Sequence, residues 1–318
     1  MTAADRSELG SAPAEPAADA RGALPPILRL VRPQQWIKNL LVFAAPAAAG
    51  VLDEADHLAH SAVVFLAFCL AASGTYCLND VADAGADRHH PTKRTRPVAS
   101  GEISPGTAVA LGVVLLAAGL VAAALSGEMA AAGVLALYVA MTTSYTYWLK
   151  HVAVIDMVVV TAGFVLRAVA GVVGTEIPVS DWYLIVASFG SLFLVAGKRS
   201  TELRLGDVAG RHRRALDDYS ASFLVLVRSF SLGITVLAYC LWAFEKSELA
   251  DSWFPWFEVS IIPFTALLLR YALAHETAEL AGPEEIVLRD RQLQAIGVVW
   301  ACCLGAGVYL IGTPPLTT

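Results

Sequence analysis

The chain has 318 residues, of which 57% are hydrophobic and only 16% are charged, and its mean hydropathy is +0.61. Soluble domains carry about 25% charged residues, so this composition excludes an ordinary soluble protein and indicates a membrane protein. The formal net charge of −6 is divided among separate loops, and the sequence predicts no nucleic-acid partner. The five cysteines lie in or beside apolar runs without a CxxC spacing, which indicates buried free thiols rather than a zinc site or disulfides.

The N-terminal stretch differs from the rest of the chain. Residues 1–23 are rich in Ala, Pro and acidic residues, and they have neither an apolar period nor the apolar core of a signal peptide. We therefore expect a disordered tail over 1–23 and one transmembrane domain over 24–318. A short amphipathic segment at 24–31 is predicted to lead into the first span along the membrane interface.

Apolar segments long enough to cross a bilayer, which takes about 20 residues, recur through the remaining chain. The sequence therefore predicts an all-α, polytopic membrane protein with about nine transmembrane helices. The expected spans are 35–52, 57–78, 105–125, 129–149, 152–174, 182–203, 219–244, 254–275 and 290–312.

Basic residues gather in alternate loops between these spans. By the positive-inside rule these loops face the cytoplasm. The N-terminus is therefore predicted to lie on the cytoplasmic side of the cell membrane and the C-terminus on the outer side. Three of the cytoplasmic loops are long and polar, at 79–104, 199–218 and 276–289, and we expect the chemistry to lie there. The cations that set this orientation include Arg29, Arg32, Lys38, Arg88, Lys93, Arg94, Arg96, Lys150, Lys198, Arg199, Arg204, Arg270, Arg289 and Arg291.

Three aspartates share one face of the predicted second helix at its cytoplasmic end. Around a helix, Asp83 lies about 60° from Asp80, and Asp87 about 20° from it. Carboxylates this close repel each other unless a cation joins them, and Mg²⁺ takes such oxygen ligands together with substrate phosphates. With Asn79, they form an N-D-x-x-D-x-x-x-D pattern, here called the acidic motif, which predicts a magnesium–diphosphate site. A solvated, salt-bridged helix end is the plain alternative.

The residues that follow carry a resemblance to a known family. The stretch HPTKRTRPVASGEI at 90–103 matches H-P-x-K-x-x-R-P-x-A-x-G-x-I, which follows the acidic motif in UbiA-type intramembrane transferases. The stretch RPQQWIKN at 32–39 and the nine expected spans also resemble that family, so the likeness covers about residues 27–312. It implies a helical bundle with a cavity open laterally to lipid, in which Mg²⁺ and a diphosphate substrate bind.

The end of the sixth expected span departs from most members of that family. The prenyltransferases carry a second aspartate-rich motif there, D-x-x-x-D, whereas this chain has GKRSTELRLGD at 197–207. Two cations, Lys198 and Arg199, thus stand where carboxylates are expected, which argues for an additional anionic group on the substrate. Together with DDYS at 217–220 and LRDR at 288–291, this stretch resembles the decaprenyl-phosphate phosphoribosyltransferase branch of the superfamily.

This resemblance implies a pentosyl transfer. The donor would be 5-phosphoribosyl 1-diphosphate, the acceptor a polyprenyl (decaprenyl) phosphate, and the product a precursor of cell-wall arabinan, with diphosphate released. Lys198 and Arg199 would hold the 5-phosphate, and Glu202 would accept hydrogen bonds from ribose hydroxyls or orient Lys198. The acceptor phosphate is already an anionic nucleophile, so we expect direct displacement at the anomeric carbon, with inversion implied by the family's β-linked product.

Other residues are expected to contact the substrates, and most have a plain alternative. Arg32 and Lys38 fit either interface anchors or phosphate ligands, although Lys38 lies one turn deeper. Tyr145 fits either a core position or a hydrogen bond to phosphate or ribose. Arg167, far inside the fifth span, is expected to form a structural ion pair or a carbonyl contact. The full predicted set comprises Asp80, Asp83 and Asp87 as catalytic and Mg²⁺-binding residues, and Lys38, Asn79, Lys93, Arg96, Tyr145, Lys150, Lys198, Arg199 and Glu202 as substrate-binding residues.

Two other function classes remain as alternatives. A prenyltransferase that moves a prenyl group from a prenyl diphosphate to an aromatic acceptor would carry carboxylates near position 198. A transporter would show inverted repeats or broken midplane helices, and the sequence offers no convincing repeat. The D-G-x-x-A-R pattern of the CDP-alcohol phosphotransferases is absent before Asp83. The sequence leaves open the length of the lipid, the number of Mg²⁺ ions and whether the chain forms a homo-oligomer.

Overall fold

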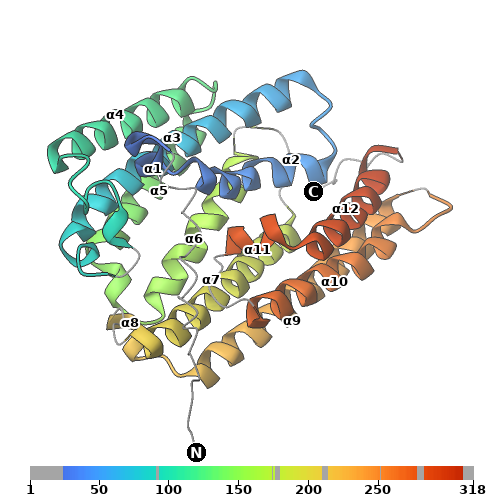
Figure 1. The fold of residues 1–318 in the computed structure, drawn as a ribbon. Helices are drawn as coiled ribbons and strands as arrows, with labels where there is room; N and C mark the ends of the chain where they lie inside the picture. Colours follow the sequence, from blue (N-terminus) through green and yellow to red (C-terminus); the bar gives the residue numbers. More distant parts are fainter. Residues whose placement is uncertain are drawn as a thin grey trace, which may run out of the picture.

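The computed structural model describes residues 24–90, 93–173, 175, 180–209, 214–250, 252–277 and 283–310, and these residues contain helices but no strand. The tail expected over 1–23 lies outside them. Figure 1 shows α3 and α4 side by side at one end of the bundle, α9, α10 and α12 side by side at the other, and α6 and α7 between them. The elements are α1 (Pro26–Val31), η2 (Pro33–Phe43), α2 (Ala44–Ala49), α3 (Ala55–Asp87), η3 (Lys93–Thr95), α4 (Pro105–Ala124), α5 (Met129–Tyr147), η4 (Leu149–His151), α6 (Ile155–Ala170), α7 (Asp181–Ala209), α8 (Arg214–Asp217), α9 (Ala221–Leu249), α10 (Trp256–Thr277), α11 (Pro283–Arg289), α12 (Arg291–Gly305) and the π-helical turn η5 (Ala306–Leu310).

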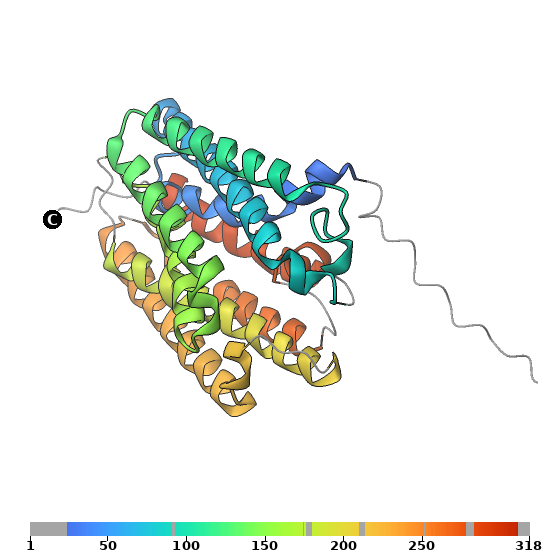
Figure 2. The ribbon, with the colours of Figure 1, turned by 90° about the vertical axis from the view of Figure 1, so that its left-hand side faces the viewer.

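The helical, membrane-spanning architecture predicted from the sequence is confirmed. In the described part of the chain, six helices are long and apolar enough to cross a membrane: α3, α4, α5, α9, α10 and α12 with η5. The long helices lie roughly parallel in a second view (Figure 2). The count of nine spans and the cytoplasmic N-terminus stay predictions.

The first expected span, 35–52, is not one α-helix. It consists of the 3₁₀ helix η2 followed by the short helix α2, which ends at Gly50 in the left-handed conformation (φ 76°). Runs of 3₁₀ helix are normally three or four residues long. Here the segment is held from the side, because the Trp36 indole N–H donates to Ser73 of α3 at 3.0 Å, and the Ser73 hydroxyl donates to the Val31 carbonyl at 2.8 Å.

Small residues let the helices of the N-terminal half approach closely. The backbone of Gly171 lies so near the carbonyl of Val42 that an added Cβ would sit only 1.8 Å from the oxygen, which fixes the end of α6 against η2. Gly74 and Gly112 bring α3 and α4 together in the same way. The acidic motif at the end of α3 is therefore carried on a tightly packed scaffold.

Side-chain caps begin two of the spanning helices near the candidate site. Ser104 accepts a hydrogen bond from the Thr107 N–H at the start of α4, and Ser220 accepts one from the Phe223 N–H at the start of α9, each at 3.1 Å. Such caps satisfy backbone donors that a helix leaves unpaired. They define where the loop after the acidic motif and the loop after α7 end.

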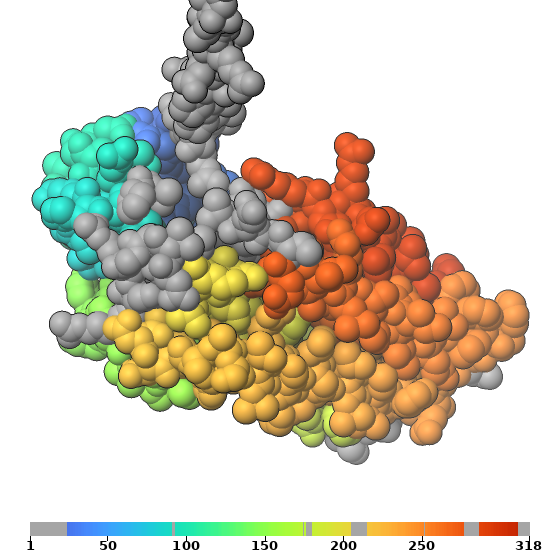
Figure 3. Space-filling model, turned by 60° about the horizontal axis from the view of Figure 1, so that its bottom comes forward, coloured from blue at the N-terminus to red at the C-terminus, as the bar shows by residue number. Residues whose placement is uncertain are grey.

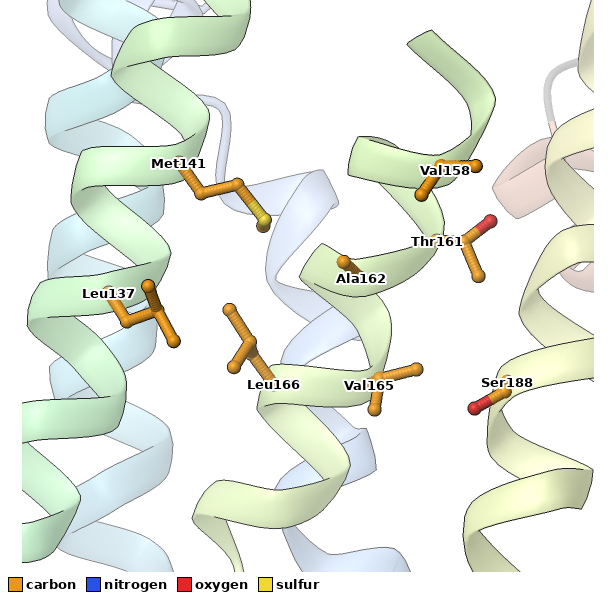
Figure 4. A pocket seen from close by; sticks show the side chains of 8 residues that line it. All are labelled: Leu137, Met141, Val158, Thr161, Ala162, Val165, Leu166 and Ser188. Carbon is orange, nitrogen blue, oxygen red and sulfur yellow. The ribbon is translucent and has the colours of Figure 1, made fainter. Parts of the chain in front are cut away.

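An apolar groove of about 350 Å³ lies between α5 and α7, with α6 as its floor (Figure 4). Val158 and Val165 of α6 face it, and each is two residues, or about 200° around the helix, from Asp156 and Arg167 respectively. The groove thus lies on the face of α6 opposite these charges. It is lined by Leu137, Met141, Val158, Thr161, Ala162, Val165, Leu166 and Ser188.

Arg167 is buried on the other face of α6. Its guanidinium donates to Asn39 of η2 at 2.7 Å, to the Gly163 carbonyl at 2.6 Å and to the Tyr138 hydroxyl of α5 at 2.8 Å. The ring of Tyr138 also stacks against it, 4.6 Å from ring centre to guanidinium carbon. The carbonyl contact expected for this residue is present, and Arg167 joins η2, α5 and α6 inside the bundle.

Candidate active site

The acidic motif at the end of α3 is surrounded by cations in the structure. Asp80 and Asp87 are buried, and the Arg96 guanidinium lies 3.6 Å from the Asp80 carboxylate and 2.6 Å from the Asp87 carboxylate. Arg32 pairs with the same oxygen of Asp80. The loop after α3 and the segment before η2 therefore close over the motif from two sides.

The conformation of Arg32 is unusual. It is in the left-handed region (φ 52°, ψ 62°) between α1 and η2, where a non-glycine residue is uncommon. The next residue, Pro33, disfavours the α conformation for Arg32 and fixes its own backbone at the start of η2. The guanidinium carbon lies 5.0 Å from the ring centre of Tyr76, so Arg32 reaches across Tyr76 to Asp80.

The third aspartate, Asp83, is engaged by η4, the short helix that follows α5. The Lys150 ammonium lies 2.5 Å from one Asp83 oxygen, and the Asn79 amide donates to the other at 3.2 Å. Thr146 donates to the Asn79 carbonyl oxygen at 3.5 Å. Lys150 itself is buried, whereas the Asp83 side chain is 26% exposed, so this ion pair is covered on the lysine side only.

The donor chemistry of the acidic motif fits a magnesium ion. The second oxygen of Asp80, Oδ2, is buried and has no hydrogen-bond partner among the described residues, so it can accept a ligand. The described residues nevertheless contain no group of three or more His, Cys, Asp and Glu side chains drawn together as metal ligands. The three carboxylates are instead neutralised separately by Arg32, Arg96 and Lys150. These cations take the place of the positive charge that Mg²⁺ would supply.

The cationic stretch at the end of α7 has a different environment. Lys198 is exposed, whereas the neighbouring Arg199 is buried. Arg199 ion-pairs with Asp156 of α6 at 2.7 Å and with Glu202 at 2.5 Å, and it donates to the Tyr145 hydroxyl of α5 at 3.0 Å. We call these four residues the Arg199 cluster.

The end of α5 connects the two sites. Tyr145 accepts the hydrogen bond from Arg199, and the next residue, Thr146, donates to Asn79 of the acidic motif. The acidic motif and the Arg199 cluster, far apart in the sequence, are thus contacted by two consecutive residues of α5. The space-filling view in Figure 3 shows the segment after the acidic motif, coloured cyan, and the orange C-terminal helices on opposite sides of one face.

The other predicted site residues lie at the edges of these two sites. The Lys38 ammonium donates to Gln35 at 2.5 Å, and the Tyr76 hydroxyl donates to the same Gln35 oxygen at 3.3 Å. Lys93 is half-buried at the start of η3, and its backbone N–H donates to His90. The residues between them, Pro91 and Thr92, lie outside the described part of the chain, as does the side chain of Asp207.

Two residues of the site were not predicted from the sequence. Asp156 is fully buried in the first turn of α6, and the Tyr219 hydroxyl donates to it at 2.5 Å. Tyr219 belongs to the DDYS stretch, whose family resemblance assigns no role to this tyrosine. A buried acidic residue just inside an apolar segment was the available signal for Asp156, because such a charge needs a partner.

A third cluster of charges lies where α7, α9 and α10 meet. Glu276 pairs with Arg228, and its other oxygen lies 3.6 Å from Arg204. Beside it, the buried His275 is in hydrogen-bond contact with Thr201 at 3.2 Å. Arg228 is thus engaged by a carboxylate of the neighbouring helix.

Comparisons with known proteins identify relatives of this chain. A model of the UbiA prenyltransferase family matches residues 40–284. The decaprenyl-phosphate phosphoribosyltransferase of Mycolicibacterium smegmatis is 43% identical over 295 residues, which are 89% of this chain and 92% of that protein. The protein of the same name from Corynebacterium glutamicum is 38% identical over 289 residues, which are 90% of this chain and 87% of that protein.

Solved structures show the same fold. A UbiA homologue from Archaeoglobus fulgidus bound to GPP and Mg²⁺ has a TM-score of 0.69 over 89% of this chain and 99% of that chain, at 20% identity. The same homologue bound to Cd²⁺ has a TM-score of 0.66. From the family match, its residue coverage and these relatives, we conclude that the chain belongs to the UbiA prenyltransferase family of membrane enzymes.

Proposed function

We propose that the protein transfers the 5-phosphoribosyl group from 5-phosphoribosyl 1-diphosphate to a polyprenyl phosphate and releases diphosphate. The transmembrane transferase domain would comprise residues 24–318 in the cell membrane, with the site facing the cytoplasm. One observation favours phosphoribosyl transfer over prenyl transfer within the family. The α7 stretch presents Lys198, Arg199 and Glu202 at the position where prenyltransferases have a second pair of aspartates.

The acidic motif would hold the diphosphate end of the donor. Asp80, Asp83 and Asp87 would bind Mg²⁺, which supplies positive charge to the leaving diphosphate as the bond to C1 breaks. Arg96 and Lys150 already contact these carboxylates, so they can exchange from carboxylate to phosphate oxygens when the donor binds. The buried Asp80 Oδ2 without a hydrogen-bond partner supports this assignment.

The Arg199 cluster would meet the ribose end of the donor. Lys198 is exposed and can pair with the 5-phosphate as a point charge. Glu202 and Tyr145 stand beside it, and their oxygens can accept hydrogen bonds from ribose hydroxyls. The link through α5 supports a single donor that spans both sites, with its diphosphate at α3 and its ribose at α7.

The acceptor needs no strong general base, because a lipid monophosphate is already an anion. Its attack on C1 from the side opposite the diphosphate forms the new C1–O bond as the old one breaks and inverts the anomeric carbon. The chain's contribution is to position both anions and to screen their repulsion, for which Lys38 and Lys93 at the edges of the site are suited.

A competition between donors tests this function. Purified protein in detergent micelles with Mg²⁺ is supplied with either phosphoribosyl diphosphate and decaprenyl phosphate, or geranyl diphosphate and 4-hydroxybenzoate. We expect a phosphoribosylated lipid from the first pair and no prenylated aromatic acid from the second. Prenyl transfer without phosphoribosyl transfer would overturn the proposal and establish the aromatic prenyltransferase alternative.

A further inference from the structure

Arg199 is held on three sides by partners from three helices. Its Nε lies 2.7 Å from Asp156 of α6, one terminal nitrogen 2.5 Å from Glu202 of α7, and the other 3.0 Å from the Tyr145 hydroxyl of α5. Its side chain is only 3% exposed. All three nitrogens of the planar guanidinium are thereby in contact with oxygens of the protein.

Asp156 is in turn fixed by Tyr219 from the segment before α9. The Tyr219 hydroxyl donates to Asp156 at 2.5 Å and accepts from the backbone N–H of Val154 at 2.6 Å. Burial and the hydrogen bond to Asp156 raise the pKa of Tyr219 above its ordinary value, so the phenol stays protonated and can donate. The ring also stacks on Phe223, with centroids 5.6 Å apart and planes 9° from parallel.

The backbone at this point is strained. Val154 has φ 67° and ψ −49°, a conformation in which a β-branched residue is a genuine outlier. Such a residue persists only where its surroundings over-determine it, and it clusters at functional sites. The Tyr219 hydroxyl supplies the constraint here, because it bonds the Val154 N–H and the Asp156 carboxylate together.

This environment restricts what Arg199 can do. If its guanidinium turned to a substrate phosphate, the fully buried Asp156 would be left without its cation, which is strongly unfavourable. Asp156 and Glu202 together also outweigh the single charge of Arg199. The two consecutive cations of the sequence are therefore not equivalent, and only Lys198 is exposed.

We propose that Asp156 and Tyr219 are positioning residues that hold Arg199 as a fixed internal cation, so that Arg199 sets the places of Glu202 and Tyr145 instead of binding a substrate phosphate. This inference rests on the proposed function for its kinetic consequences. Under it, the 5-phosphate contact belongs to Lys198, while Asp156 and Tyr219 control the placement of the ribose ring through Glu202 and Tyr145.

A chemical-labelling experiment tests the geometry without any assay of activity. Phenylglyoxal modifies accessible arginines, and peptide mapping by mass spectrometry locates the products. In the parent protein we expect exposed Arg94 to react and Arg199 to be protected. In the Asp156→Asn variant, Arg199 should become reactive while the reactivity of Arg94 stays the same. If Arg199 reacted as readily as Arg94 in the parent protein, Arg199 would not be a fixed internal cation and the proposal would fail. This outcome does not depend on which reaction the protein performs.

Kinetics then separate positioning from phosphate binding. Ribose 5-phosphate serves as a competitive inhibitor that carries the phosphate and the ring but no diphosphate. We expect Lys198→Ala to raise its inhibition constant about tenfold or more, as the loss of a charge-assisted hydrogen bond does. Asp156→Asn and Tyr219→Phe should change that constant less than about twofold while kcat falls about tenfold or more, because a misplaced group costs rate. If Asp156→Asn raised the constant as much as Lys198→Ala, Arg199 would be a phosphate ligand and the proposal would fail.

A double-variant cycle adds a third readout. Asp156 acts on the ribose through Arg199 and Glu202, so the loss of kcat in Asp156→Asn/Glu202→Gln should be no greater than in the worse single variant. Additive losses would show that the two carboxylates act independently and would contradict the proposal. Tyr219→Phe keeps the ring stacked on Phe223 and the charge of Asp156, so it provides the same comparison if Asp156→Asn does not fold.

Discussion

The Lys150 ammonium lies 2.5 Å from Asp83, and this contact ties η4, directly after α5, to the acidic motif of α3. Lys150 is buried, whereas Asp83 is only partly covered, so the pair is accessible from the aspartate side. Tyr145, in the last turn of α5 just before η4, accepts a hydrogen bond from Arg199. Residues 145–150 thus couple the proposed diphosphate and ribose ends of the site.

We predict that Lys150→Gln lowers kcat/KM by about 10- to 100-fold, because it removes one charge-assisted contact from Asp83 or from the bound diphosphate. The measurement is the initial rate of phosphoribosyl transfer at varied donor concentration. Arg94→Ala, which removes an exposed cation from the same side of the protein, is the matched control and should retain the full rate. Equal losses in both variants would mean that only the general positive charge matters.

Asp80→Asn should reduce turnover by about 100-fold or more, since even outer-shell partners of a bound metal contribute about 10- to 100-fold. Asp80 is buried, and both Arg32 and Arg96 contact it, so the variant should also release these cations. Asp56→Asn, at the exposed start of the same helix, is the control and should not change the rate. A rate for Asp80→Asn close to that of the control would remove the acidic motif from the mechanism.

Arg167→Leu should destabilise the protein by about 2 to 4 kcal/mol, because it leaves Asn39, the Gly163 carbonyl and Tyr138 without their common donor inside the bundle. The expected readout is a lower thermal unfolding midpoint in detergent. Arg167→Lys keeps the charge, but its single ammonium cannot reproduce the planar fork, so its midpoint should be intermediate. An unchanged midpoint in the leucine variant would show that these hydrogen bonds contribute nothing to stability.

The ion pair between Asp290 and Arg270 should make stability depend on acidity. Hydrogen bonds from Arg270 and from the Leu293 N–H hold the pKa of Asp290 below its ordinary value. A carboxylate with a depressed pKa contributes stability above its unfolded pKa, about 4, and loses that contribution as the pH falls through the folded pKa. Asp290→Asn keeps an N-cap for α12 but loses the charge. We expect it to be less stable than the parent by about 1 kcal/mol or less at pH 7, with the difference shrinking as the pH falls below about 4. A gap that widens in acid would contradict this sign.

Much of the fold could be predicted from the sequence, because long apolar runs leave few alternatives. The expected span at 105–125 is α4, Pro105–Ala124, and the one at 254–275 is α10, Trp256–Thr277. The sequence predicts one helix over 35–52, but tertiary contacts shape this segment as η2 and α2. Hydrogen bonds to Ser73 and Arg167 hold Trp36 and Asn39, and no local propensity encodes these partners.

The site shows the same division between local and distant information. Helical periodicity alone places Asp80, Asp83 and Asp87 on one face, because their spacing is local. The pairing of Asp80 with Arg32 depends on how η2 packs against α3, which no short stretch specifies. The charge of Arg199 was evident from the sequence, but its burial was not, because that depends on Asp156 and Tyr145 in other helices.

The most direct test of the proposed function follows the two ends of the donor separately. Phosphoribosyl diphosphate labelled with ³²P in its 5-phosphate, or in its diphosphate, is incubated with the protein, Mg²⁺ and a polyprenyl phosphate, and the lipid is then extracted. The proposed transfer predicts that the 5-phosphate label enters the lipid phase while the diphosphate label stays in water. EDTA should prevent the 5-phosphate label from entering the lipid. Diphosphate label in the lipid, or no label from the 5-phosphate, would contradict it.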